Sequence, residues 1–180
     1  IIDSDDLAIS LTASIESAFG SRRIAAGFLL NNQLTDFAFD PTGPDGRPRA
    51  NAPGPGKRPR SSMSPTIAYR AGEDRPALLL GSPGGSRIPE YVAGALIRMV
   101  RLGRDPAAAA AGFHLSQRNR GAVTLEDGAA PETLTNALAA RGHATERSAM
   151  TSGLHIIHIR RDGTLEGGAD PRREGLAAGD

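Results

Sequence analysis

The chain has 180 residues, with 21 Lys and Arg against 20 Asp and Glu, 4% aromatic residues and no cysteine. A near-neutral chain without a basic, aromatic-rich stripe is not expected to bind nucleic acid, and the lack of cysteine excludes disulfides, thiolate metal sites and a cysteine nucleophile. No run approaches the roughly 18 apolar residues that cross a bilayer, so we expect no membrane partner. The length is typical of a single hydrophobic core, so we expect one domain over residues 1–180.

The first half of the chain is rich in predicted strands. Alternating apolar and polar residues predict a strand over 7–15, and the short apolar run 25–30 predicts another. Residues 66–70 and 77–80, separated by the turn sequence AGEDRP, are typical of a hairpin. The segment 40–60 is crowded with proline, glycine and arginine, which indicates a long surface loop.

The second half alternates predicted helices with strands. Apolar residues at helical spacing predict helices over 90–103, 105–112 and 131–142, the last beginning at a proline and ending at a glycine. Residues 122–126 and 154–159 predict two strands, and the second turns into a final extended piece. Strands, then helices, then strands favour an α+β layered domain.

A glycine-rich loop, GSPGGS, follows the predicted strand 77–80. A phosphate-binding P-loop would need a lysine after its last glycine, and here Ser86 and Arg87 follow instead. Adjacent glycines let the backbone approach a bound group closely, so Gly84 and Gly85 can direct their amides at a developing oxyanion. An ordinary tight turn is the alternative interpretation of this stretch.

Two further polar stretches suit the two charged ends of an amino acid. Ser61 and Ser62 lie beside a basic loop, where hydroxyls and amides can bind a carboxylate. Gln33 and Asp36 follow an apolar run, where a carboxylate can neutralise a substrate ammonium. A solvated loop and a capped turn are the respective structural alternatives.

The four histidines, His114, His143, His155 and His158, do not form a metal-ligand pattern. His155 and His158 are three residues apart in a predicted strand and so face opposite sides of it, which disfavours a shared metal. Each is better interpreted as a satisfied or surface histidine. No G-x-S-x-G sequence supports a Ser-His-Asp triad, and we expect neither a metal nor a cofactor.

Taken in order, the motifs LLNNQLTDF, GKRPRSSMSPTI and GSPGGSRIP resemble the small subunit of the γ-glutamyltranspeptidases, or γ-glutamyltransferases, of the N-terminal-nucleophile hydrolase superfamily. The similarity extends from FGS at 19–21 to GGADPRREGLAAG near the end. It implies a four-layer αββα sandwich of which this chain is the small-subunit part. It also implies a partner, the large subunit from the same self-cleaving precursor.

The resemblance implies γ-glutamyl transfer or hydrolysis of γ-glutamyl amides such as glutathione. In this family the first residue of the small subunit is a threonine whose free amine, with a reference pKa of about 7.7–8.0, serves as base for its own hydroxyl. The resulting acyl-threonine is resolved by water or by an amino-acid acceptor. Bacterial relatives are typically periplasmic or secreted, which we expect here as well.

The resemblance also implies roles for individual residues. Gly84 and Gly85 would form the oxyanion hole, and Ser61 and Ser62 would hold the substrate α-carboxylate. The substrate α-amine would be held by Gln33 and Asp36, while Ser14 would support the nucleophile in place of the usual second threonine.

Two departures from the family pattern modify these expectations. The Thr-Thr-His-like segment expected just before residue 1 is absent from the sequence, so the chain is expected to lack the nucleophile. Glu16 stands where the family usually has an asparagine. The carboxylate of Glu16 would strengthen binding of the substrate ammonium but would repel a carboxylate within about 4–6 Å. The alternatives are an acylase for another side-chain amide, such as a glutaryl β-lactam or poly-γ-glutamate, and a non-catalytic fragment or paralogue.

Overall fold

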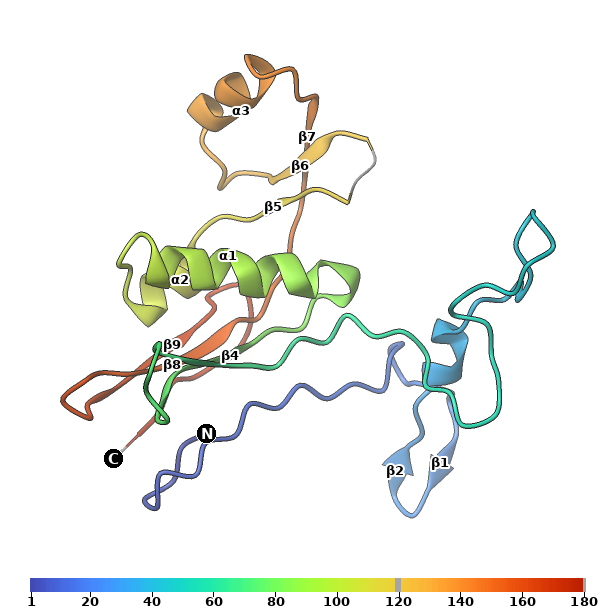
Figure 1. Cartoon of the computed structure of the whole chain (residues 1–180), viewed down its shortest axis with the longest axis horizontal. Coiled ribbons are helices and arrows are strands. Elements are labelled where there is room, and N and C mark those ends of the chain that lie inside the picture. The colour runs from blue at the N-terminus through green and yellow to red at the C-terminus, as the bar shows by residue number, and fades with distance from the viewer. Residues whose placement is uncertain (119–120, 180) are drawn as a thin grey trace. The chain divides into compact units, whose positions relative to one another are not determined.

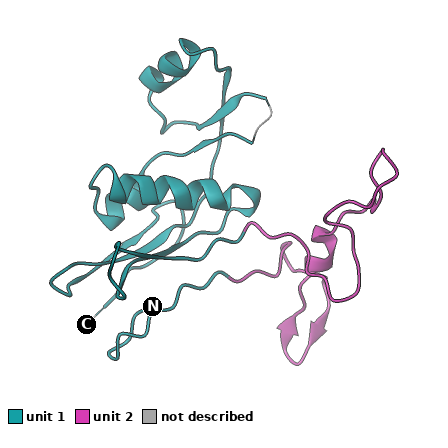
Figure 2. Ribbon diagram, in the orientation of Figure 1, with its two compact units in different colours: residues 1–12, 63–180 teal, residues 13–62 magenta. Residues whose placement is uncertain are grey.

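The computed structural model describes residues 1–118 and 121–179 (Figure 1). The chain divides into two compact units, the first comprising Ile1–Thr12 with Met63–Asp180 and the second comprising Ala13–Ser62 (Figure 2). Among the described residues, no helix has both the length and the apolar character needed to span a membrane.

The main sheet of the first unit has four antiparallel strands in the order β3-β4-β8-β9. These strands are β3 (Thr66–Tyr69), β4 (Pro76–Gly81), β8 (His155–Ile159) and β9 (Leu165–Ala169). The hairpin and the two later strands confirm the sequence predictions. Strand β4 carries the run of leucines, which is buried along its length, and it leads directly into the glycine-rich loop.

Two helices cover one face of this sheet (Figure 1). They are α1 (Ile88–Val100) and α2 (Pro106–Ala111), both predicted from the sequence. Their apolar sides meet the sheet in a core that includes Leu78, Leu80, Val92, Ala95, Ala109, Leu154 and Ile156. Burying each leucine, isoleucine or valine side chain contributes roughly 1.5–3 kcal/mol to folding, so this cluster is the larger of the two core clusters in the unit.

A smaller sheet of the same unit has the order β5-β6-β7, with β5/β6 antiparallel and β6/β7 parallel. Its elements are β5 (Leu115–Ser116), β6 (Val123–Glu126), β7 (Thr145–Ser148) and the helix α3 (Glu132–Ala139). The helix and β6 confirm the sequence predictions. Val123, Leu125 and Ala130 form a second core cluster.

A buried ring of polar groups links the two sheets. Arg172 makes a bidentate pair with Glu126, at 2.6 and 2.8 Å, and a 3.0 Å bond with Asp170. Asp170 accepts from the hydroxyl of Ser152, which lies 2.6 Å from His114 Nε2. The amide of His114 closes the ring by donating to Glu126 at 2.8 Å. Each charge is paired, as burial in a low-dielectric interior requires.

The ring fixes the protonation of His114, which is 2% exposed. Because the single proton of the Ser152 hydroxyl is donated to Asp170, His114 Nε2 must carry the proton that it shares with Ser152. Burial, reinforced by the charge of Arg172, lowers the pKa of His114 from 6.5 to about 4. The imidazole is therefore neutral at physiological pH.

This neutral histidine predicts an acid-sensitive stability. The unfolded chain takes up a proton near pH 6.5 and the folded chain only near pH 4, so the free energy of unfolding falls as the pH drops across that interval. His114→Gln, which keeps a donor toward Ser152 but does not titrate, is expected to flatten this dependence. Thermal unfolding of both proteins between pH 7 and about 4.5 measures it, and equal slopes would contradict the assignment.

The second unit contains a short hairpin, a single helical turn and a long loop. The hairpin pairs β1 (Ile24–Ala25) with β2 (Phe28–Leu29), and the turn is the 3₁₀ helix η1 (Gln33–Asp36). Residues 40–60 contain neither helix nor strand, as the sequence predicts.

The prediction of a strand over residues 7–15 is wrong. This segment has only an isolated bridge, between Ile2 and Ala8. Its two-residue periodicity persists, but the polar side faces inward: Ser10 Oγ donates to the carbonyl of Leu80 at 3.1 Å. The apolar side is exposed, with Leu11 80% accessible. Alternation marks extended backbone, whereas a strand also needs a continuous ladder of backbone hydrogen bonds. The backbone hydrogen bonds of this segment are scattered, as between Ile9 and Ile1 and between Ile15 and Asn32.

Candidate functional site

The glycine-rich loop of the first unit runs from the end of β4 into η2 (Gly85–Arg87) and α1. Gly84 has φ +139° and Gly85 has φ +60°, in the region that L side chains rarely adopt. A Cβ on Gly84 would lie 2.5 Å from Cε2 of Tyr91, whereas one on Gly85 would meet nothing within 4 Å. Position 84 therefore requires glycine for both space and conformation, and position 85 for conformation alone.

The amides of this glycine pair are available to a ligand. Neither the Gly84 nor the Gly85 amide donates a hydrogen bond to another residue in the described part of the chain. The preceding residue pair is held firmly: buried Ser82 Oγ donates to the carbonyl of Pro83 at 2.7 Å and accepts from the amide of Gly153 at 3.1 Å. Fixed amides without an acceptor are the donors that an oxyanion hole needs.

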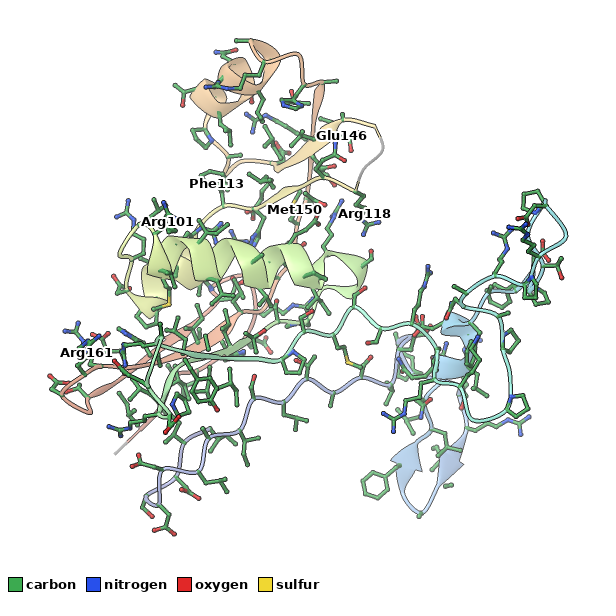
Figure 3. The ribbon with its side chains drawn as sticks, in the orientation of Figure 1. Arg101, Phe113, Arg118, Glu146, Met150 and Arg161 are labelled. Carbon is green, nitrogen blue, oxygen red and sulfur yellow. The ribbon has the colours of Figure 1, made fainter. Side chains whose placement is uncertain are left out.

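Two hydrogen bonds from arginines hold the residues that follow the glycines. Arg118 donates to Ser86 Oγ, and Figure 3 shows its side chain beside the end of α1 at which η2 lies. Arg87 donates to the carbonyl of Ala149 at 3.5 Å. These contacts restrain the far side of the loop.

In the second unit, Glu16 is the centre of a polar cluster. Its carboxylate accepts from Ser17 Oγ and, at 2.6 Å, from Asn32 Nδ2. These hydrogen bonds, from Ser17 first and Asn32 second, lower the pKa of Glu16, so this exposed carboxylate is an anion at neutral pH. The Glu16 amide donates to Ser14 Oγ at 2.8 Å, which brings these two candidate residues together in one turn with Glu16 at φ +71°.

The turn η1 supplies the other two candidates. Gln33 Nε2 donates to Asp36 Oδ2 at 3.3 Å, which holds the amide beside the carboxylate. Gln33 Oε1 is buried and has no hydrogen-bond partner among the described residues, a costly arrangement for a polar atom. Asn32, just before the turn, also donates to Thr35 Oγ1 at 3.0 Å and so joins η1 to the Glu16 cluster.

Asn51 connects η1 to the serine pair. Its Nδ2 donates to the carbonyl of Asp36 at 2.7 Å, and its Oδ1 accepts from the amide of Arg60 at 3.0 Å. Arg60 directly precedes Ser61 and Ser62, of which the first is exposed and the second half-buried. The six candidates of this unit are thus linked through Asn32 and Asn51.

Asn32→Asp is expected to disturb this cluster, because it places a second carboxylate against Glu16 where an amide now donates. Repulsion should raise the pKa of Glu16 and weaken the turn, which lowers the melting temperature. Asn31→Asp is the matched control, because the side-chain oxygen of Asn31 accepts from the Gln33 amide at 3.0 Å, a role that aspartate keeps. Thermal unfolding of the two variants is the measurement. Equal melting temperatures would contradict the role of Asn32 in this cluster.

Sequence reasoning missed the residues that hold the candidates in place. It selected Ser14, Glu16, Gln33 and Asp36, which the structure connects, but neither Asn32 nor Asn51. Asn32 had a local signal, since asparagine before a polar turn commonly bonds its own backbone neighbourhood. Asn51 had none, because its two partners are distant in the sequence.

The four histidines lie in separate places in the structure and do not form a cluster. His155 Nδ1 lies 3.2 Å from the carbonyl of Gly153, and His158 Nδ1 lies 3.0 Å from Glu166. His143 is exposed, and His114 belongs to the buried ring. In the described ranges, no group of three or more His, Cys, Asp or Glu side chains is arranged to hold a metal.

Comparison with known proteins gives matches along the whole chain. The family model described as γ-glutamyltranspeptidase matches residues 1–180. The glutathione hydrolase proenzyme of Escherichia coli (strain K12) is 37% identical over 188 residues, covering 99% of this chain and 32% of that protein. The chain thus spans about a third of the length of that relative.

Two solved structures are similar in fold. The T380A mutant of Helicobacter pylori γ-glutamyltranspeptidase has a TM-score of 0.83 and 30% identity, covering 96% of this chain and 97% of that one. The γ-glutamyltranspeptidase of Pseudomonas nitroreducens complexed with L-DON also has a TM-score of 0.83 and 30% identity, covering 100% and 97%. These similarities confirm the α+β fold expected from the sequence.

Proposed function

The chain belongs to the γ-glutamyltranspeptidase family over residues 1–180. We therefore propose that it is the small-subunit part of an enzyme that transfers or hydrolyses γ-glutamyl groups, with glutathione as a donor. The observation that carries the proposal is the loop at Gly84 and Gly85, whose amides have no acceptor in the described part of the chain. Such donors stabilise the oxyanion of acyl transfer.

In the proposed reaction a threonine hydroxyl attacks the γ-carbonyl of the donor. Its proton passes to the α-amine of the same residue, and the Gly84 and Gly85 amides stabilise the negative charge on the carbonyl oxygen. The leaving amine takes up the proton as the amide bond breaks, which gives an acyl-threonine ester. Water hydrolyses this ester, or an amino acid or peptide accepts the acyl group. We place the nucleophilic threonine in the part of the gene product before Ile1, with Ser14 supporting it.

The second unit supplies the groups that recognise the glutamyl end of the donor. Asp36 and the anionic Glu16 bind its ammonium, and Gln33 offers its unpartnered Oε1 to the same group. Ser61 and Ser62 bind the α-carboxylate by hydrogen bonds to the charged acceptor. Two carboxylates favour a donor that carries an α-ammonium over a glutaryl compound that lacks one.

A large subunit from the same precursor is the proposed partner. Leu7, Ile9 and Leu11 turn their side chains outward from the first unit, with 46–80% of each exposed. A row of apolar side chains on extended backbone is typical of a surface that another chain covers. The relative from E. coli is named a proenzyme and is about three times as long as this chain, which supports a two-part precursor. We also propose a periplasmic or secreted location.

The test is an assay of the matured protein containing both parts of the precursor. It is expected to release the chromophore from γ-glutamyl-p-nitroanilide and to leave glutaryl-p-nitroanilide, the same compound without the ammonium, essentially intact. No release of the chromophore by a correctly matured protein would contradict the proposal. Equal rates on both compounds would favour an acylase of broader side-chain specificity.

A further inference from the structure

Tyr91 lies directly under the glycine-rich loop. It is on the first turn of α1 and is 2% exposed. Gly84 approaches it so closely that a Cβ would lie 2.5 and 2.9 Å from two ring carbons, Cε2 and Cδ2. Because an ordinary contact to a Cβ is 3.4–4 Å, the backbone of Gly84 rests on the face or edge of this ring.

The ring of Tyr91 also packs against the ring of His114. The centroids of the Tyr91 and His114 rings are 4.2 Å apart, at an interplanar angle of 42°, and His114 is fixed by the hydrogen bond to Ser152 and by its amide bond to Glu126. Aromatic pairs at this separation attract beyond their buried area. Tyr91 therefore contacts both the glycine loop and the buried ring of polar groups.

This arrangement bears on the direction of the Gly84 amide. Glycine is the least restrained residue, and φ +139° is not fixed by a side chain of its own. A donor contributes to transition-state stabilisation only if it is already oriented toward the oxyanion. The contact with Tyr91 supplies a restraint that the loop sequence itself does not provide.

We propose that Tyr91 is a positioning residue of the oxyanion hole: its ring, packed against His114, holds the Gly84 amide in the orientation that acyl transfer requires. This inference rests on the proposed function. Tyr91 itself touches no reacting atom, so removal of its ring should weaken stabilisation of the tetrahedral intermediate and leave binding of the ground-state donor nearly unchanged.

The test is a double-mutant cycle in the matured enzyme with Gly84→Ala and Tyr91→Leu. Tyr91→Leu is expected to lower kcat about tenfold with less than about a twofold change in the donor KM, and Tyr91→Phe to restore kcat. Gly84→Ala should lower kcat about a hundredfold. The double variant should lose no more kcat than Gly84→Ala alone, because leucine removes the ring with which the new Cβ collides. Additive losses would overturn the inference.

A second readout separates positioning from general destabilisation. A γ-boronic acid analogue of glutamate, which adds to the threonine hydroxyl as a tetrahedral adduct, should bind Tyr91→Leu about tenfold more weakly, whereas glutamate itself should bind equally well. Leu125→Ala, a cavity in the second core cluster, is the control and should lower the melting temperature without changing kcat. An equal fall in kcat in this control would overturn the inference.

Two further outcomes are distinguishable. If Tyr91→Leu does not fold, Tyr91→Met, which refills the space with a flexible apolar chain, takes its place in the cycle with the same expected losses. A wild-type enzyme that hydrolyses the γ-glutamyl anilide, combined with unchanged kcat in these variants, contradicts the role of Tyr91 alone. An inactive wild-type enzyme contradicts the proposed function and the role of Tyr91 together.

Discussion

Gly84→Ala is expected to lower kcat for γ-glutamyl-p-nitroanilide by about 10²–10³, the usual cost of losing one oxyanion-hole donor. The added Cβ would lie 2.5 Å from the ring of Tyr91, in a conformation that L residues rarely adopt, so the loop must move and turn its amide away. The donor KM should change little, because the ground-state carbonyl needs this donor less than the oxyanion does.

Gly103→Ala is the matched control for this substitution. Gly103 also has a positive φ, +61°, but a Cβ there meets nothing within 4 Å. It therefore tests a positive φ without a steric clash, beyond the C-terminal end of α1 and away from the loop. Steady-state kinetics and thermal unfolding of both variants measure the difference. Equal kcat losses would assign the effect to stability rather than to the oxyanion hole.

Asp36→Asn is expected to lower kcat/KM by about 10²–10³, mostly through KM. The change removes the charge that meets the substrate ammonium, and breaking a charge-assisted contact of this kind typically costs about 2–5 kcal/mol. The remaining carboxylate of Glu16 should retain part of the binding. Initial-rate kinetics over a range of donor concentrations gives kcat and KM separately.

Asp45→Asn removes the same charge from the same unit without touching the site. Asp45 Oδ1 accepts from the amide of Arg47 at 3.1 Å, a role that asparagine keeps. This variant should behave as wild type. If Asp36→Asn and Asp45→Asn have the same donor KM, then Asp36 does not bind the ammonium.

The secondary structure was largely predictable because its signals are local. The helices α1 and α2 have apolar residues at helical spacing and a proline at their first turn, and the hairpin of β3 and β4 surrounds a turn sequence. The segment 7–15 was misassigned because alternation specifies extended backbone but not a partner. Its leucines are exposed, and under the proposed function they belong to the surface that we assign to the large subunit.

The candidate residues could be selected from the sequence, whereas the residues that contact them could not, and the roles of the candidates stay predictions. Gly84, Gly85 and Asp36 belong to motifs with recognisable chemistry. Tyr91 and Asn51 are ordinary residues by sequence, and the contacts that single them out form only after folding. The buried ring shows the same limit, because Glu126 and Arg172 are 46 residues apart and nothing in the local pattern pairs them.

The proposed reaction requires an acyl-threonine intermediate at a threonine in the part of the gene product before Ile1. Mass spectrometry of the intact mature small subunit and of its proteolytic peptides, after mixing with a γ-glutamyl donor and rapid acid quenching, detects this intermediate. We expect an N-terminal threonine and a transient mass increase of one glutamyl group on the peptide that contains it. A mature chain with another first residue, or a glutamyl adduct on a different peptide, would contradict the proposed reaction.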